Sequence, residues 1–271
     1  MVTATPFTRE AGAGPAVVCL HSNASSSNQW RDLLETLSPR FHVLAPDSYG
    51  SGKSVDWPSD RTICLDDEVD FIAPVLRSAG ESFFVVAHSY GAAIALKLAL
   101  KEPGRVRAMV LYEPTLFSLI DAQSPSPNAA DGIRHAVQAA GHALDAGNPS
   151  NAAMHFIDYW MGPQSWDSTP DSRKAPISAS IVNVRRWGHA LFTEPAALSA
   201  FSHLDIPVLY LVGKSSPESA LGVAQLLSSV LPRVEFREFD GLGHMGPLTH
   251  PKIVNDAIAD FLDKQIIELR I

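Results

Sequence analysis

Ser89 stands at a junction that could make its hydroxyl a nucleophile. Residues 83–87 are apolar, and the first four are aromatic or β-branched, as in a buried strand; an alanine-rich helical segment begins at residue 90. Strand, sharp turn and helix in this order form the setting of a nucleophile elbow, which lifts a serine hydroxyl above a sheet edge. Gly91 tolerates the close approach of the two backbones. Ala87 stands where the usual motif has glycine, and alanine is still small.

A serine hydroxyl is a weak nucleophile unless a neighbouring base takes its proton. The chain has ten histidines, and context selects among them. His244 lies in a glycine-rich loop after the last predicted strand and before the last predicted helix, where it can reach the elbow. His250 falls near the start of that helix, and His88 is fixed within the elbow with its side chain directed away. The sequence therefore predicts His244 as the base.

Short apolar segments alternate with helical patterns, which indicates a mostly parallel sheet with crossover helices. The segments that we predict as strands are 16–20, 41–45, 82–87, 106–111, 207–212 and 234–239. The segments that we predict as helices are 28–37, 66–79, 90–101, 218–231 and 252–264. Pro74 should kink or shorten the second helix. The residues before 16 leave room for one short edge strand.

The alternation stops between residues 114 and 204, where helical patterns occur at 129–146 and 152–161. An insertion of this size is expected to form a helical lid over the carboxyl ends of the strands, where ligands bind in such sheets. A helical extension packed elsewhere is the alternative. Five aromatic residues of the insertion could line a substrate pocket, although residues at helical spacing more often pack the insertion against the core. They are Phe117, Phe156, Trp160, Trp187 and Phe192.

With these motifs in place, the chain resembles lid-bearing serine hydrolases of the α/β-hydrolase fold. Residues 21–26, His-Ser-Asn-Ala-Ser-Ser, resemble the family's oxyanion loop with Ser22 in the place of glycine. Residues 46–54 resemble its Pro-Asp-x-x-Gly-x-Gly-x-Ser segment. The resemblance implies an α/β core of residues 1–113 and 205–271, with the lid at 114–204. It also implies that the backbone N–H groups of Asn23 and Tyr90 form an oxyanion hole, and the Tyr90 side chain is a further candidate for the pocket.

The acid of the triad departs from the common family pattern. In most members an aspartate follows the strand that we place at 207–212, but Ser216 stands there and a hydroxyl carries no negative charge. Some haloalkane dehalogenases of this fold carry the acid at the end of the strand after the elbow helix. Glu113 lies at that point here, so we predict Glu113 as the acid that orients His244. Glu218 in a shifted loop and a dyad without an acid remain alternatives.

Composition narrows the class of partner. The net charge of −8 and the lack of a basic cluster argue against nucleic acid. Two cysteines make no disulfide framework. The first residues show no basic-then-apolar leader and no apolar run is long enough to cross a membrane, so we expect a cytoplasmic protein. The histidines lack metal-ligand spacing, and neither a metal nor another cofactor is expected. We expect a monomer or homodimer that acts on a small molecule with an apolar acyl or aromatic group.

The chemistry that follows is hydrolysis of a small carboxylic ester, lactone or thioester through an acyl-enzyme on Ser89. Two alternatives remain open. One is a carbon–carbon bond hydrolase or lyase that uses the same triad. The other is a non-catalytic receptor that retains the fold and binds a small molecule, which the absence of an aspartate at 216 would fit. A serine at the nucleophile position argues against dehalogenase and epoxide hydrolase chemistry, because both use an aspartate there.

Overall fold

The structure is a computed structural model that describes residues 5–268. Within this range seven strands form one sheet in the order β1-β3-β2-β4-β5-β6-β7. Only the edge strand β1 runs antiparallel to its neighbour, and the other pairs are parallel. The strands are β1 Thr8–Ala11, β2 Ala16–Leu20, β3 His42–Pro46, β4 Phe83–His88, β5 Val106–Tyr112, β6 Val208–Gly213 and β7 Val234–Phe239. The predicted α/β fold with a mostly parallel sheet is confirmed.

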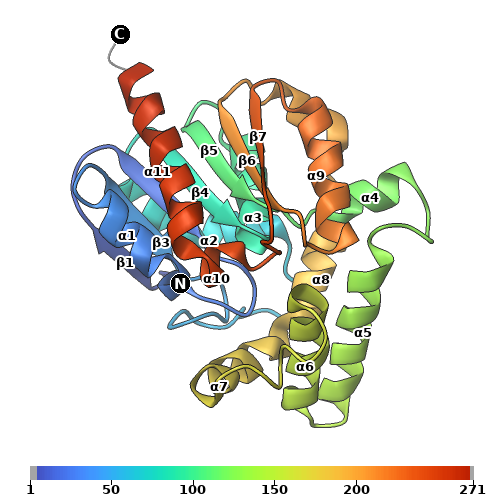
Figure 1. The fold of residues 1–271 in the computed structure, drawn as a ribbon. Helices are drawn as coiled ribbons and strands as arrows, with labels where there is room; N and C mark the ends of the chain where they lie inside the picture. Colours follow the sequence, from blue (N-terminus) through green and yellow to red (C-terminus); the bar gives the residue numbers. More distant parts are fainter. Residues whose placement is uncertain (1–4, 269–271) are drawn as a thin grey trace.

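Helices cover both faces of the sheet (Figure 1). On one face, α1 (Arg31–Leu37) and α11 (Pro251–Glu268) pack on apolar side chains of the central strands. On the other face lie α2 (Leu65–Ser78), α3 (Tyr90–Lys101) and α9 (Glu218–Val230). Alternate residues of each buried strand contribute to the two cores, as period-two side-chain direction requires. Short helices η1 (Ser27–Trp30) and α10 (Gly246–Thr249) complete this part of the chain.

Residues 114–204, called here the helical insertion, lie between β5 and β6. Figure 1 shows α5 to α8 gathered beside one end of the sheet. The elements of the insertion are α4 Phe117–Gln123, α5 Asp131–Asp145, α6 Pro149–Met161, α7 Asp171–Ser180, η2 Ile181–Asn183, α8 Val184–Phe192 and η3 Leu198–His203. The two helical patterns expected in this segment correspond to α5 and α6. The sequence did not predict α4, α7 or α8, which are short and, in α7, weakly amphipathic around Pro176.

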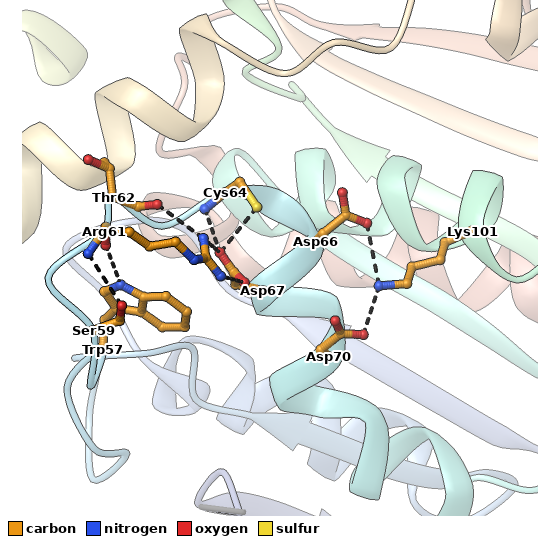
Figure 2. A network of polar contacts seen from close by, with 9 residues as sticks. All are labelled: Trp57, Ser59, Arg61, Thr62, Cys64, Asp66, Asp67, Asp70 and Lys101. Carbon is orange, nitrogen blue, oxygen red and sulfur yellow. Dashed lines mark hydrogen bonds and ion pairs between the residues drawn. The ribbon is translucent and has the colours of Figure 1, made fainter.

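Helix α2 agrees with the predicted bounds of 66–79 to within one residue, and Pro74 does not shorten it, since the helix continues to Ser78. The carbonyl that Pro74 cannot bond belongs to Asp70, which is exposed and can be hydrated. Figure 2 shows how the start of α2 is fixed: the Cys64 N–H and thiol donate to the Asp67 carboxylate at 2.9 and 3.1 Å, and Arg61 pairs with the same group.

The same helix is tied to the helix that follows the elbow. Lys101, at the end of α3, pairs with Asp70 at 2.7 Å and with Asp66 at 3.4 Å (Figure 2). Exposed pairs of this kind contribute little stability each. Together with the buried apolar contacts between α2 and α3, these ion pairs hold the two helices against each other.

Candidate active site

Ser89 lies in the sharp turn between β4 and α3. Its φ of 56° and ψ of −117° fall outside the helical and extended regions, a conformation that costs a non-glycine residue about 1–3 kcal/mol. The following glycine makes the turn sterically possible. A Cβ on Gly91 would lie 2.4 Å from the Leu20 carbonyl oxygen of the neighbouring strand β2, so a larger residue does not fit.

The register of β4 and β5 brings Ser89 and Glu113 to neighbouring points of the sheet edge. His88 pairs with Tyr112 in this parallel ladder, and the Ser89 N–H donates to the Tyr112 carbonyl at 2.9 Å. Both strands end at this pair, so Ser89 and Glu113 leave the sheet at the same edge, the one formed by the carboxyl ends of the strands. Glu113 does so with a φ of 46°, in the left-handed region that few non-glycine residues adopt.

Three side chains form a hydrogen-bonded series at this edge. The Ser89 hydroxyl donates to His244 Nε2 at 2.9 Å. The His244 Nδ1–H donates to Glu113 Oε2 at 2.7 Å. These bonds assign the imidazole proton to Nδ1 and leave Nε2 as an acceptor. Glu113 is completely buried and His244 is 2% exposed, so the carboxylate and the imidazole are shielded from water.

The Glu113 carboxylate has partners on both of its oxygens. While Oε2 accepts from His244, Oε1 accepts from the Gly213 N–H at 2.7 Å and from the Ser216 hydroxyl at 2.6 Å. A buried carboxylate is costly unless it is hydrogen-bonded in this way. Glu218, the alternative acid, is exposed in the first turn of α9. Glu113 is therefore the carboxylate that contacts the imidazole.

The loop that carries His244 is held to the end of β5. The Tyr112 hydroxyl donates to the Gly243 carbonyl at 2.8 Å. A Cβ on Gly246 would lie 2.1 Å from the same Tyr112 oxygen, so glycine is required where the loop passes the ring. The contact of Gly246 with the Tyr112 ring and the hydrogen bond to the Gly243 carbonyl hold the loop on both sides of His244.

Asn23 follows β2, the strand next to β4 in the sheet, and Tyr90 directly follows Ser89. Tyr90 is the first residue of α3, and the first N–H groups of a helix have no acceptor within it. His21 Nδ1–H donates to the Ser22 carbonyl at 2.7 Å, and its Nε2 accepts from the Ser48 N–H at 3.0 Å. Because a peptide group is planar and trans, the Asn23 N–H is directed opposite to the carbonyl that His21 holds.

The Tyr90 side chain is not a pocket residue. It is 1% exposed, and its hydroxyl donates to Glu68 Oε1 at 3.2 Å beneath the elbow. The expectation that it extends into the pocket is wrong. The reason is that α3 packs closely against α2, so the ring at its first position fills the space between the two helices.

A cavity of about 890 Å³ opens beside Ser89 and His244. It is lined by residues from the segments 22–32, 156–180 and 244–251, together with Gly50 and Gly52. Two of the predicted aromatic residues, Phe156 and Trp160, belong to this lining. The Trp160 indole stacks on the His244 imidazole with ring centroids 3.8 Å apart and planes at 23°. The helical insertion therefore contacts the imidazole directly.

Phe117, Trp187 and Phe192 are not among the residues that line this cavity, and their prediction as pocket residues is wrong. They pack as a second layer: Trp187 contacts Phe156, with centroids 6.0 Å apart, and Phe117 contacts Trp160 at 6.5 Å and Phe192 at 5.1 Å. Helical periodicity shows which face of a helix is apolar but not which element covers that face.

Comparison with known proteins identifies the family. Residues 15–251 match the family model described as alpha/beta hydrolase fold. This chain belongs to that family. One relative, the proline iminopeptidase of Heyndrickxia coagulans, is 25% identical over 94% of this chain and 92% of its own length. Another, the 2-(acetamidomethylene)succinate hydrolase of Mesorhizobium japonicum, is 27% identical over 94% of this chain and 90% of its own.

Solved structures agree on the fold of this α/β-hydrolase. A thermophilic esterase from Thermogutta terrifontis superposes with a TM-score of 0.77 at 21% identity, covering 96% of this chain and 93% of the esterase. The names of these relatives span several substrates. Family membership therefore supports hydrolysis, and the substrate has to be argued from the site of this chain.

Sequence reasoning missed two partners in this α/β-hydrolase. The sequence indicated only that Ser216 is unable to be the acid, yet its hydroxyl donates to the Glu113 carboxylate. Trp160 was expected to line the pocket, and nothing in the sequence placed its ring on His244. A hydroxyl-bearing residue at the usual position of the acid is a signal that could have indicated the first contact.

Two buried ionisable groups beside the elbow have shifted pKa values. Burial, with the nearby His244, lowers the pKa of His88 well below its ordinary value, so this ring is neutral. Burial raises the pKa of Glu68 to about 8. Within residues 5–268 of this hydrolase, no group of three or more acidic, histidine or cysteine side chains could hold a metal ion. In the same range, no helix combines the length and apolarity needed to span a membrane.

Proposed function

We propose that this α/β-hydrolase is a serine hydrolase that cleaves a small carboxylic ester through an acyl-enzyme on Ser89. The observation that carries the proposal is the hydrogen-bonded series from Ser89 to His244 to Glu113, at 2.9 and 2.7 Å, with the acid fully buried. A nucleophile, a base and a group that orients the base are the parts that acyl transfer needs.

In the proposed mechanism His244 Nε2 takes the Ser89 proton as the oxygen attacks the substrate carbonyl. Glu113 holds the imidazole in the correct tautomer and stabilises the imidazolium that forms. The N–H groups of Asn23 and Tyr90 donate to the oxyanion. His244 then gives its proton to the departing alkoxide, which leaves as the alcohol. Water, deprotonated by His244, attacks the acyl-enzyme and releases the acid and the free serine.

The cavity guides the choice of substrate. Phe156 and Trp160 supply an aromatic surface next to His244, against which we place an apolar acyl or aryl group. The helical insertion, with α6 and α7 in the cavity lining, acts as the lid of residues 114–204 over the core formed by 1–113 and 205–271. In this proposal the protein works without a metal or another cofactor.

The two alternatives differ in their support. The receptor alternative was raised by the absence of an aspartate at 216, and the 2.7 Å contact between His244 and Glu113 supports the catalytic proposal over it. Carbon–carbon bond cleavage would use the same side chains, so the substrate assay has to separate it from ester hydrolysis.

The test is turnover of short-chain aryl esters by the purified protein, next to vinylogous diketones. We expect ester hydrolysis and covalent labelling of Ser89 by a fluorophosphonate. Ser89→Ala should keep the thermal unfolding temperature and lose at least about a thousandfold in kcat, since removing a triad nucleophile typically costs more than that. Cleavage of diketones but not esters would reassign the reaction, and absence of labelling would contradict an activated serine.

A further inference from the structure

Gln29 makes hydrogen bonds in two directions from the edge of the cavity. It belongs to η1, is half-buried, and lines the cavity. Its Oε1 accepts from both the N–H and the hydroxyl of Ser22, at 3.1 and 3.0 Å. Its Nε2 donates to His88 Nδ1 at 3.1 Å. One carboxamide therefore joins the loop that carries Asn23 to the residue before the nucleophile.

His88 continues the connection to the loop of the base. Its Nε2–H donates to the His244 carbonyl at 2.8 Å, and its Nδ1 accepts from Gln29. A neutral imidazole has one donor and one acceptor, and both are used here. Only the Nε2–H tautomer satisfies the two partners. The ring is completely buried, so water cannot substitute for either bond.

This series of hydrogen bonds ends at two peptide groups that matter for the proposed reaction. At one end the Ser22 N–H is held by Gln29, while His21 holds the Ser22 carbonyl. The peptide that contains the Asn23 N–H is thus held by His21 through its carbonyl, and the peptide directly before it is held by Gln29. At the other end, the His244 carbonyl is fixed by His88 and the preceding carbonyl by Tyr112. A misplacement of about 1 Å at such groups can cost about a hundredfold in rate.

We propose that Gln29 is a positioning residue which, through Ser22 and His88, sets the Asn23 donor and the His244 base relative to each other. This inference rests on the proposed function for its effect on catalysis. Its carboxamide oxygen is already engaged twice by Ser22, so Gln29 acts on the site through these neighbours and not by accepting from substrate.

The first test is Gln29→Met, which keeps the length of the side chain and removes all three bonds. We expect kcat for the ester to fall about 10- to 100-fold with KM within about twofold of wild type, because an interaction realised in the transition state is lost. Gln225→Met is the matched control: Gln225 is exposed on α9 and is not among the residues that line the cavity, so this variant should retain wild-type kcat and KM.

A double-mutant cycle tests whether Ser22 acts through Gln29. Ser22→Ala removes the hydroxyl that donates to Gln29, and we expect it to lower kcat by itself but not further in the Gln29→Met background. Full additivity of the losses in kcat from Ser22→Ala and Gln29→Met would overturn the proposed connection through hydrogen bonds. A Gln29→Met variant with unchanged kcat, or with its whole effect in KM, would overturn it as well.

The ring signals of ¹⁵N-labelled histidines test the inference independently of the substrate assay. In protein labelled with ¹⁵N-histidine, wild type should show the Nε2–H tautomer of His88. Gln29→Met should shift the ring signals of both His88 and His244, whereas Gln225→Met should not. Unchanged His244 signals would contradict the positioning role even if no ester is turned over. Wild-type protein without turnover or labelling would count against the proposed function alone.

Discussion

Ser216 donates its hydroxyl to Glu113 at 2.6 Å, so the residue at the family's usual acid position hydrogen-bonds to the carboxylate that contacts His244. The two residues come from adjacent strands. Glu113 follows β5, Ser216 lies just after β6, and the ladder between them pairs Tyr112 with Leu211. The contact accounts for a small polar residue at 216, because an aspartate there would set a second buried carboxylate against Glu113.

Replacing the acid tests the role of Glu113. In Glu113→Gln the amide would donate to His244 Nδ1 and force the proton onto Nε2, so the ring could no longer accept from Ser89. We expect kcat/KM to fall about 10³- to 10⁴-fold. Glu218→Gln is the matched control and should stay within about twofold, since that carboxylate is exposed. Steady-state kinetics of both variants decide the assignment, and the reverse order of effects would transfer the role to Glu218.

Removing the Ser216 hydroxyl should affect stability more than activity. Ser216→Ala leaves the buried Glu113 with one donor fewer, and a hydrogen bond to a charged group contributes about 1.5–3 kcal/mol. We expect a loss of that order in the free energy of unfolding by urea, together with a several-fold fall in kcat. Ser215→Ala is the control because Ser215 is exposed in the same loop. Equal unfolding curves for the two variants would show that the bond contributes nothing.

Glu68 should make stability depend on pH. Its pKa is raised by burial to about 8 from an ordinary 4.5. Between these values the folded state holds a proton that the unfolded chain releases, so the free energy of unfolding falls as the pH rises through this window. Glu68→Gln mimics the protonated form and should remove this part of the fall.

The measurement is urea unfolding of wild type and Glu68→Gln at about pH 5 and about pH 8. Wild type should lose more stability than the variant across this interval. Glu35→Gln, at an exposed carboxylate on α1, serves as the control and should follow wild type. Parallel pH profiles for wild type and Glu68→Gln would contradict the proton uptake assigned to Glu68.

Trp160 should set which esters fit. Trp160→Phe shortens the aromatic surface beside His244, so we expect the ratio of kcat/KM between a bulky and a short acyl ester to rise about fivefold or more. Trp187→Phe changes the same residue type in the second layer, outside the cavity, and should leave the ratio unchanged. A series of ester chain lengths measures both, and equal responses would assign the selectivity to overall packing of the insertion.

The sequence alone determined the sheet, the elbow and the histidine loop. These features depend on local patterns: apolar strands of fixed period, a glycine that permits close backbone approach at Gly91, and a glycine-rich turn around His244. Strand prediction differed from the structure by about one residue at the ends, as at β3, because strand ends depend on pairing with neighbours. These local patterns also follow one another along the chain in the order that an α/β fold requires, which is why the fold could be predicted.

The tertiary structure decided what meets at the edge of the sheet. Only the β4–β5 and β5–β6 registers bring Glu113 beside both His244 and Ser216, and only the packing of α6 puts Trp160 and not Trp187 against the imidazole. The link from Gln29 through His88 to the His244 loop joins three distant segments. Such contacts depend on strand order and on how the helices pack, and the spacing of residues along a single segment predicts neither.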